Sequence, residues 1–251
     1  MTDLHWWQLL ALAVVGLVSG FLNILAGGGS LLTLPLLIFL GLPAAQANGT
    51  NRVAILVQNM FALKSFHNSG VLSWRLALSC ACPAVVGAVI GAHLAVKIDE
   101  QLFKQVLAGV MVLVLIVTTF DPAKRYRDKF ATGFLSRSVL LMTGFFMVGI
   151  YGGFIQAGVG FLILSVTMMV GLDLVKGNVL KVVVVFILNV PALAIFAWNG
   201  QVDWLLGAVL ATGNACGGAM AARLAVVKGH QWLRGVVTVV VLLCAVRLLL
   251  G

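Results

Sequence analysis

The segment AGGGSLLTLPLLIFLG, residues 26–41, decides how this chain folds. Its apolar run occupies only residues 31–40, and glycine lies on both sides of that run. A helix of about ten residues rises about 15 Å, half of the ~30 Å hydrocarbon core of a bilayer. The segment therefore predicts a short helix within a membrane protein, either a re-entrant hairpin or part of a broken, strongly tilted crossing.

The rest of the chain is typical of an all-α polytopic membrane protein. Its 251 residues are 62% hydrophobic and only 9% charged, whereas soluble domains carry about 25% charged residues. A helical crossing needs about 20 apolar residues. The sequence predicts eight such full spans, at residues 4–25, 47–66, 74–96, 102–120, 134–155, 179–198, 204–226 and 232–250.

A second copy of the glycine-bounded segment, QAGVGFLILSVTMMVG, occupies residues 156–171. Scarce residue types coincide at one constant offset between the two halves, as in Gly28/Gly158, Gly41/Gly171, Asn48/Asn178, Asn59/Asn189 and Trp74/Trp204. This pattern predicts two repeats, each of four full spans plus one short helix. The first repeat would cover residues 1–120 and the second residues 134–251, with a linker at residues 121–133.

The distribution of positive charge predicts the orientation of these repeats. The linker region is basic, with Lys124, Arg125, Arg127, Lys129 and Arg137. By the positive-inside rule we expect it in the cytoplasm, with the protein in the inner membrane. In each repeat the first span and the short segment together return the chain to the side on which the repeat began, and three further spans follow. Each repeat therefore crosses the membrane a net odd number of times. The two repeats are therefore expected to be inverted relative to each other.

Several function classes are disfavoured by the same sequence. The sixteen Lys and Arg residues are scattered singly, which does not suit nucleic-acid binding. All seven carboxylates fall at span ends or in loops, so a midplane cation site is not expected. We find no metal-ligand spacing and no nucleophile beside a base, and therefore predict no metal, no cofactor and no enzymatic activity.

The two glycine breaks are the first candidate binding site. Glycine lets the backbone turn sharply, and the helix that follows presents free N–H groups and the positive end of its dipole, which attract anions. The alternative is that these glycines only allow close helix packing. The candidate residues are Gly27, Gly28, Gly29, Ser30 and Thr33 in the first repeat, and Gln156, Gly158 and Gly160 in the second.

Polar residues at the start of the following span form a second candidate group. It comprises Asn48, Asn51 and Arg52 in the first repeat, and Asn178 and Lys181 in the second. One hypothesis is that Arg52 from the outer side and Lys181 from the inner side attract an anion toward the breaks. The alternative is a plain helix N-cap beside a cation at the membrane interface. Under the first hypothesis, Arg52→Gln and Lys181→Gln would weaken flux and leave the folded yield unchanged.

Three amides near the middle of their spans complete the candidate site. Gln58, Asn59 and Asn189 lie where an unpaired amide costs several kcal/mol in hydrocarbon. We expect them to face protein or water, either along an anion path or as hydrogen bonds between helices.

The motifs GGGSLLTLP at 27–35, GLP at 41–43, ANGTNR at 47–52 and QN at 58–59 resemble the first repeat of the sulfite exporter TauE/SafE family of bacterial membrane permeases. The second copy, with GVG at 158–160 and KGNVLK at 176–181, also fits, although it departs from the glycine pattern at Val159 and Phe161. The resemblance implies transport of small sulfur-containing anions such as sulfite or organosulfonates, driven by an ion or proton gradient.

These features together predict an inner-membrane secondary transporter that carries a small inorganic or organic anion by alternating access. An anion channel on the same scaffold is the main alternative, and a membrane enzyme or assembly factor is a third. The exact substrate, the coupling ion, the direction of transport and homo-oligomerisation stay open at this stage.

Overall fold

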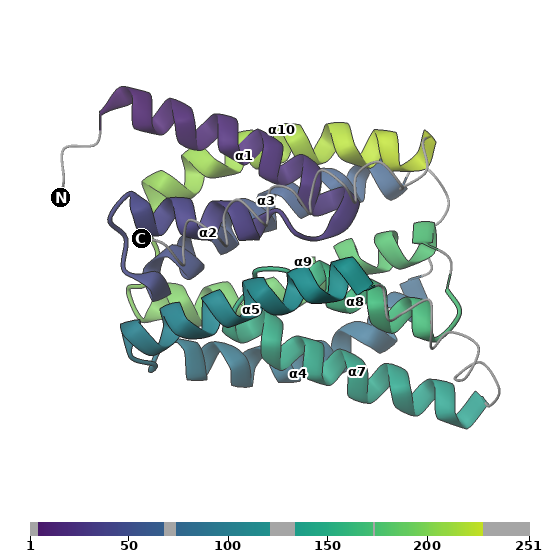
Figure 1. Cartoon of the computed structure of the whole chain (residues 1–251). Helices are drawn as coiled ribbons and strands as arrows, with labels where there is room; N and C mark the ends of the chain where they lie inside the picture. Colours follow the sequence, from purple (N-terminus) through teal and green to yellow (C-terminus); the bar gives the residue numbers. More distant parts are fainter. Residues whose placement is uncertain (1–4, 68–73, 121–133, 173, 228–251) are drawn as a thin grey trace.

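A computed structural model describes residues 5–67, 74–120, 134–172 and 174–227. Over these ranges the chain forms nine α-helices and no strand, and the helices run roughly along one common direction (Figure 1). They are α1 (Trp6–Ala26), α2 (Ser30–Phe39), α3 (Ala44–His67), α4 (Trp74–Ala95), α5 (Glu100–Phe120), α7 (Phe134–Phe154), α8 (Val159–Met169), α9 (Leu174–Trp198) and α10 (Trp204–Val227). The predicted all-α class is confirmed for these residues.

Helix ends differ from the prediction where polar residues were taken as boundaries. The span expected at 47–66 begins at Ala44, and the span expected at 179–198 begins at Leu174. The polar residues near these starts, such as Asn48 and Asn178, are buried inside the protein and do not mark a membrane surface. The predicted linker at 121–133 and the predicted last span at 232–250 lie outside the described residues.

Four described helices are both long and apolar enough to cross a membrane, over Trp6–Leu25, Trp74–Ala95, Val175–Trp198 and Trp204–Leu224. The prediction of eight full spans is thus met only in part. Helix α3 has the length, at 24 residues, but its buried Asn, Gln and Arg side chains lower its hydropathy. A count based on hydropathy treats such side chains as if they faced lipid, although they face other helices. The two short helices, α2 and α8, are present as predicted.

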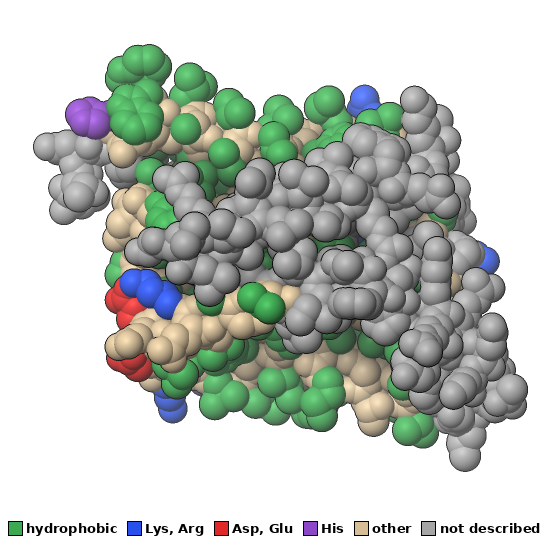
Figure 2. Space-filling model, in the orientation of Figure 1, with side chains coloured by type: hydrophobic (Ala, Val, Ile, Leu, Met, Phe, Trp, Pro, Cys, Tyr) green, Lys and Arg blue, Asp and Glu red, His purple; other side chains and the backbone are tan. Residues whose placement is uncertain are grey.

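Tryptophan residues lie at the predicted helix ends. The described ones, all half-exposed or more, are Trp6, Trp7, Trp74, Trp198 and Trp204. Figure 2 shows hydrophobic side chains along the visible sides of the bundle and charged side chains at its two ends. This distribution suits a protein whose middle faces lipid.

Helix packing follows one pattern in both halves of the bundle. Helix α1 packs along α10, which also contacts α3, whereas α7 packs along α4, which also contacts α9. Glycines allow these close approaches: a Cβ atom at Gly217 would meet the backbone of Leu17, and one at Gly87 would meet the backbone of Phe146. Small residues that let helices pack closely are typical of membrane bundles. Helices α3 and α9 contact each other and so join the group of α1, α3 and α10 to the group of α4, α7 and α9.

The two short helices return the chain toward the end of the bundle from which it came. In Figure 1, α1 starts at the left end and α2 leads back toward it, whereas α7 starts at the right end and α8 leads back to the right. Each return begins at a glycine with positive φ, Gly27 at 84° and Gly158 at 73°. These backbone conformations suit glycine and strain other residues. Both turns are buried inside the bundle, where they can border a site.

Candidate functional site

The two glycine turns touch each other in the interior. A Cβ atom added at Gly27 would collide with the Cα atom of Gly160, and one added at Gly160 would collide with Gly27. The backbones can approach this closely only because neither residue has a side chain. The turn after α1 and the start of α8, far apart in the sequence, therefore form one central junction.

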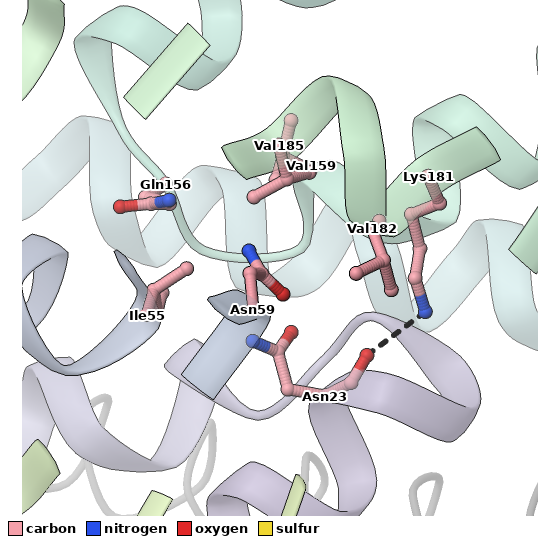
Figure 3. A pocket seen from close by; sticks show the side chains of 9 residues that line it. Asn23, Ile55, Asn59, Gln156, Val159, Lys181, Val182 and Val185 are labelled. Atoms are coloured by element: carbon pink, nitrogen blue, oxygen red, sulfur yellow. Dashed lines mark hydrogen bonds between the residues drawn. The ribbon is translucent and has the colours of Figure 1, made fainter. Parts of the chain in front are cut away.

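A pocket opens beside this junction (Figure 3). Its walls come from α1, α3, α9, the segment before α8 and the first turn of α8. The lining residues are Asn23, Ile55, Asn59, Gln156, Val159, Gly160, Lys181, Val182 and Val185. The polar wall consists of amides and one cation, and it includes no carboxylate.

Two amides of the pocket have atoms without a hydrogen-bond partner. Asn59 and Gln156 are 2% and 1% exposed, yet Asn59 Nδ2 and both Gln156 amide atoms lack a partner in the structure. Figure 3 shows the two amide groups near each other, each with its nitrogen atom on the side that faces the other residue. A buried polar group left unpaired costs about 1–3 kcal/mol. Such groups in a polar pocket are available to a ligand.

Lys181 lies on α9 and binds the end of α1. Its ammonium group donates hydrogen bonds to the carbonyl oxygens of Asn23, at 2.9 Å, and Ile24, at 2.7 Å. These carbonyls belong to the last turn of α1, where the helix dipole is negative. The Asn23 oxygen also accepts a hydrogen bond from the Gly27 amide. Lys181 is only 3% exposed, so its charge is held inside the protein and beside the pocket.

Arg52 lies on α3 and binds the end of α7 in a similar way. Its Nη2 donates to the carbonyl oxygens of Gly152, at 3.0 Å, and Gly153, at 2.5 Å. The guanidinium carbon lies 4.7 Å from the centre of the Phe196 ring. Arg52 is completely buried but does not line the pocket. It lies about 12 Å from the start of its helix, at 1.5 Å per residue.

Asn48 also caps α7 and does not cap its own helix. It is the fifth residue of α3, and its Nδ2 donates to the carbonyl oxygen of Phe154 at 2.8 Å. The alternative of an N-cap beside an interfacial cation is therefore wrong for Asn48 and Arg52. The sequence could not reveal this because the capped helix lies about one hundred residues away.

Other predicted residues lie outside the pocket lining. Thr33 donates to Asn51 Oδ1 at 2.6 Å, which links α2 to α3. Asn23 Nδ2 lies 3.4 Å from Gln58 Oε1, its acceptor. Asn178 is buried on α9, and its Oδ1 has no partner.

The candidate set thus divides into two parts. The structure places Asn59, Gln156, Gly160 and Lys181 around the pocket. The predicted residues outside its lining are Gly27, Gly28, Gly29, Ser30, Thr33, Asn48, Asn51, Arg52, Gln58, Gly158, Asn178 and Asn189.

Sequence reasoning missed two polar residues. Asn23 lines the pocket from α1, and Asn214 on α10 is fully buried with both amide atoms unpaired. A search based on the repeat could not find them, because the matching positions hold Gly153 and Ala84. An amide within a long apolar run was the available signal. Within the described ranges, no three His, Cys, Asp or Glu side chains gather as metal ligands would.

Comparison with known protein families identifies the family of this chain. Residues 12–248 match the family model described as "Sulfite exporter TauE/SafE". This chain belongs to the sulfite exporter TauE/SafE family. The resemblance noted in the glycine and Asn-Gly-Thr-Asn-Arg motifs is confirmed over nearly the whole chain.

TauE/SafE relatives carry transporter names. A "Probable membrane transporter protein ORF9" from Sinorhizobium sp is 27% identical, over 99% of this chain and 95% of the relative. A "Probable membrane transporter protein" from Haemophilus influenzae is 28% identical over 90% and 88%, and the Escherichia coli K12 protein YfcA, with the same description, is 26% identical over 94% and 87%. No solved structure matches the chain. The TauE/SafE chain is accordingly a membrane transporter.

Proposed function

We propose that this TauE/SafE chain is a secondary transporter that moves a small sulfur-containing anion, sulfite or an organosulfonate, across the membrane by alternating access. The family assignment and the names of the relatives support the transporter class. The central pocket supports the substrate class, and the relation between the two halves supports the mechanism.

The observation that carries the substrate class is the set of donors around the pocket. Lys181 brings a positive charge, and the amide nitrogens of Asn59 and Gln156 are donors without acceptors. The first turn of α8, with Val159 and Gly160, adds the positive end of a helix dipole. An oxyanion carries several acceptor oxygens and a negative charge, and so complements all of these groups.

The order and packing of the helices support inverted repeats as the basis of alternating access. The series α1 to α4 has lengths of 21, 10, 24 and 22 residues, and the series α7 to α10 has lengths of 21, 11, 25 and 24 residues. The first helix of each series packs on the fourth helix of the other. With the two series starting from opposite ends (Figure 1), the pocket could open to each side in turn. The proposed repeats are residues 1–120 and 134–251.

The direct test is flux of sulfite and of a taurine-type sulfonate into proteoliposomes, with and without an imposed pH gradient. We expect saturable uptake that responds to the gradient, and none in protein-free vesicles. Counterflow separates a carrier from the channel alternative, because internal unlabelled substrate accelerates uptake through a carrier only. Gradient-driven uptake of neither anion by folded protein would reject the proposed substrate class.

A further inference from the structure

Two buried cations hold, in a reciprocal manner, the ends of α1 and α7, the helices that lead into the glycine turns. Arg52, from the first half, binds carbonyls in the last turn of α7, which belongs to the second half. Lys181, from the second half, binds carbonyls in the last turn of α1, which belongs to the first half. Each cation therefore fixes the helix that leads into a glycine turn of the opposite half.

The two cations differ in how firmly they are held. Arg52 contacts two carbonyls, lies over the Phe196 ring and exchanges hydrogen bonds with Asn189. Lys181 has two carbonyl partners, and an ammonium group has three donors. Lys181 also borders the pocket, and Arg52 does not. Of the two cations, only Lys181 can thus meet a ligand in the pocket.

The carbonyl partners of Lys181 do not balance its charge. The end of a helix carries about half of a negative elementary charge, and the pocket lining includes no carboxylate. An ammonium group buried in this way would be neutralised better by a ligand with a full negative charge, because attraction is strong where water is excluded. An oxyanion can therefore compete with the carbonyl oxygens of Asn23 and Ile24 for the same donors.

We infer that Lys181 is an exchangeable latch: the bound oxyanion takes its ammonium group from the Asn23 and Ile24 carbonyls and releases the last turn of α1. Arg52 keeps the last turn of α7 fixed throughout. This inference rests on the proposed function, since it takes the anion to be the ligand of the pocket. Substrate binding thus frees the turn at Gly27. Only a negatively charged ligand can release this turn, because it must attract the Lys181 ammonium group.

Hydrogen exchange at the end of α1 tests the latch. The amide of Gly27 donates to the carbonyl oxygen of Asn23 at 2.8 Å, so its exchange reports on this turn. Saturating sulfite is added to the purified protein in nanodiscs, and exchange is followed in peptides covering residues 20–32 and 148–157. We expect at least about tenfold faster exchange in the first peptide, because loss of one charge-assisted hydrogen bond gives about that factor and the latch releases two. No change is expected in the second peptide.

Variants of Lys181 make the test specific. In Lys181→Met the end of α1 should exchange fast without sulfite and should not respond to it. Lys181→Arg keeps charge and donors and should retain the response, which guards against a folding defect in the methionine variant. Lys176→Met, at an exposed position on the same helix, is the matched control and should behave as the wild type.

Flux measured on the same preparations separates the two proposals. Sulfite transport with unchanged or slower exchange in residues 20–32 would overturn the latch and leave the transporter proposal standing. An equal sulfite response in Lys181→Met and the wild type would also overturn it. Absence of both sulfite binding and flux would reject the latch together with the proposed substrate.

Discussion

Arg52 and Asn189 are hydrogen-bonded to each other in both directions. Arg52 Nη1 lies 3.4 Å from the acceptor Asn189 Oδ1, and Asn189 Nδ2 donates to the backbone oxygen of Arg52 at 2.8 Å. The pair joins α3 to α9 in the bundle interior. It also holds the guanidinium group where it reaches the end of α7.

This pairing predicts that Arg52 matters for stability. Replacing Arg52 with Gln shortens the side chain and leaves the carbonyls of Gly152 and Gly153 unpaired. At about 1–3 kcal/mol for each buried unpaired group, the loss is roughly 2–6 kcal/mol. Thermal unfolding of the purified protein in detergent should therefore shift clearly downward, contrary to the unchanged folded yield expected from sequence alone.

The exposed Arg75→Gln variant is the control for loss of a positive charge. Equal unfolding temperatures for Arg52→Gln and Arg75→Gln would contradict the capping role of Arg52.

Close contact at the glycine junction gives a second prediction. Gly160→Ala places a methyl group against the Cα atom of Gly27, so the two turns must separate. We expect reduced folded yield and loss of transport. Gly109→Ala is the matched control, because nothing lies within 4 Å of a Cβ atom there and alanine favours a helix. A Gly160→Ala protein as stable and active as Gly109→Ala would show that the turns do not need this contact.

More of the fold than of the candidate site could be predicted from the sequence. Runs of apolar residues and glycine punctuation predict the described helices and both short ones, since these features depend on local sequence. Contacts between distant segments are not contained in that pattern. Asn48 reads as a local cap but binds Phe154, and Asn23 has no counterpart in the second half that would single it out. Arg52 and Lys181 look equivalent in sequence, and only packing places one of them on the pocket.

Two asparagines on α3 should separate ligand binding from folding. Asn59 Nδ2 has no partner, so Asn59→Leu removes no hydrogen bond of that nitrogen and should leave the unfolding temperature unchanged or raised. Asn48→Leu leaves the Phe154 carbonyl without its partner and should lower stability by about 1–3 kcal/mol. Both variants are compared by thermal unfolding without substrate. A larger destabilisation by Asn59→Leu would mean that Asn59 is a structural residue.

Orientation in the membrane is a further prediction. In a variant without native cysteines, Arg75→Cys should react with an impermeant maleimide only from the cytoplasmic side, and Lys97→Cys only from the outside. Both positions are exposed, near the start and beyond the end of α4, respectively. Labelling of intact spheroplasts and of inside-out vesicles distinguishes the two sides. The reverse pattern would overturn the proposed cytoplasmic placement of the basic linker.

Sulfite counterflow in proteoliposomes, with the wild type beside Asn59→Leu, shows whether the anion binds in the central pocket. We expect saturable counterflow in the wild type. We expect at least about tenfold less in Asn59→Leu, because the leucine removes a donor and fills the pocket, although the protein stays folded. Equal counterflow in both proteins would contradict the claim that the anion binds in this pocket.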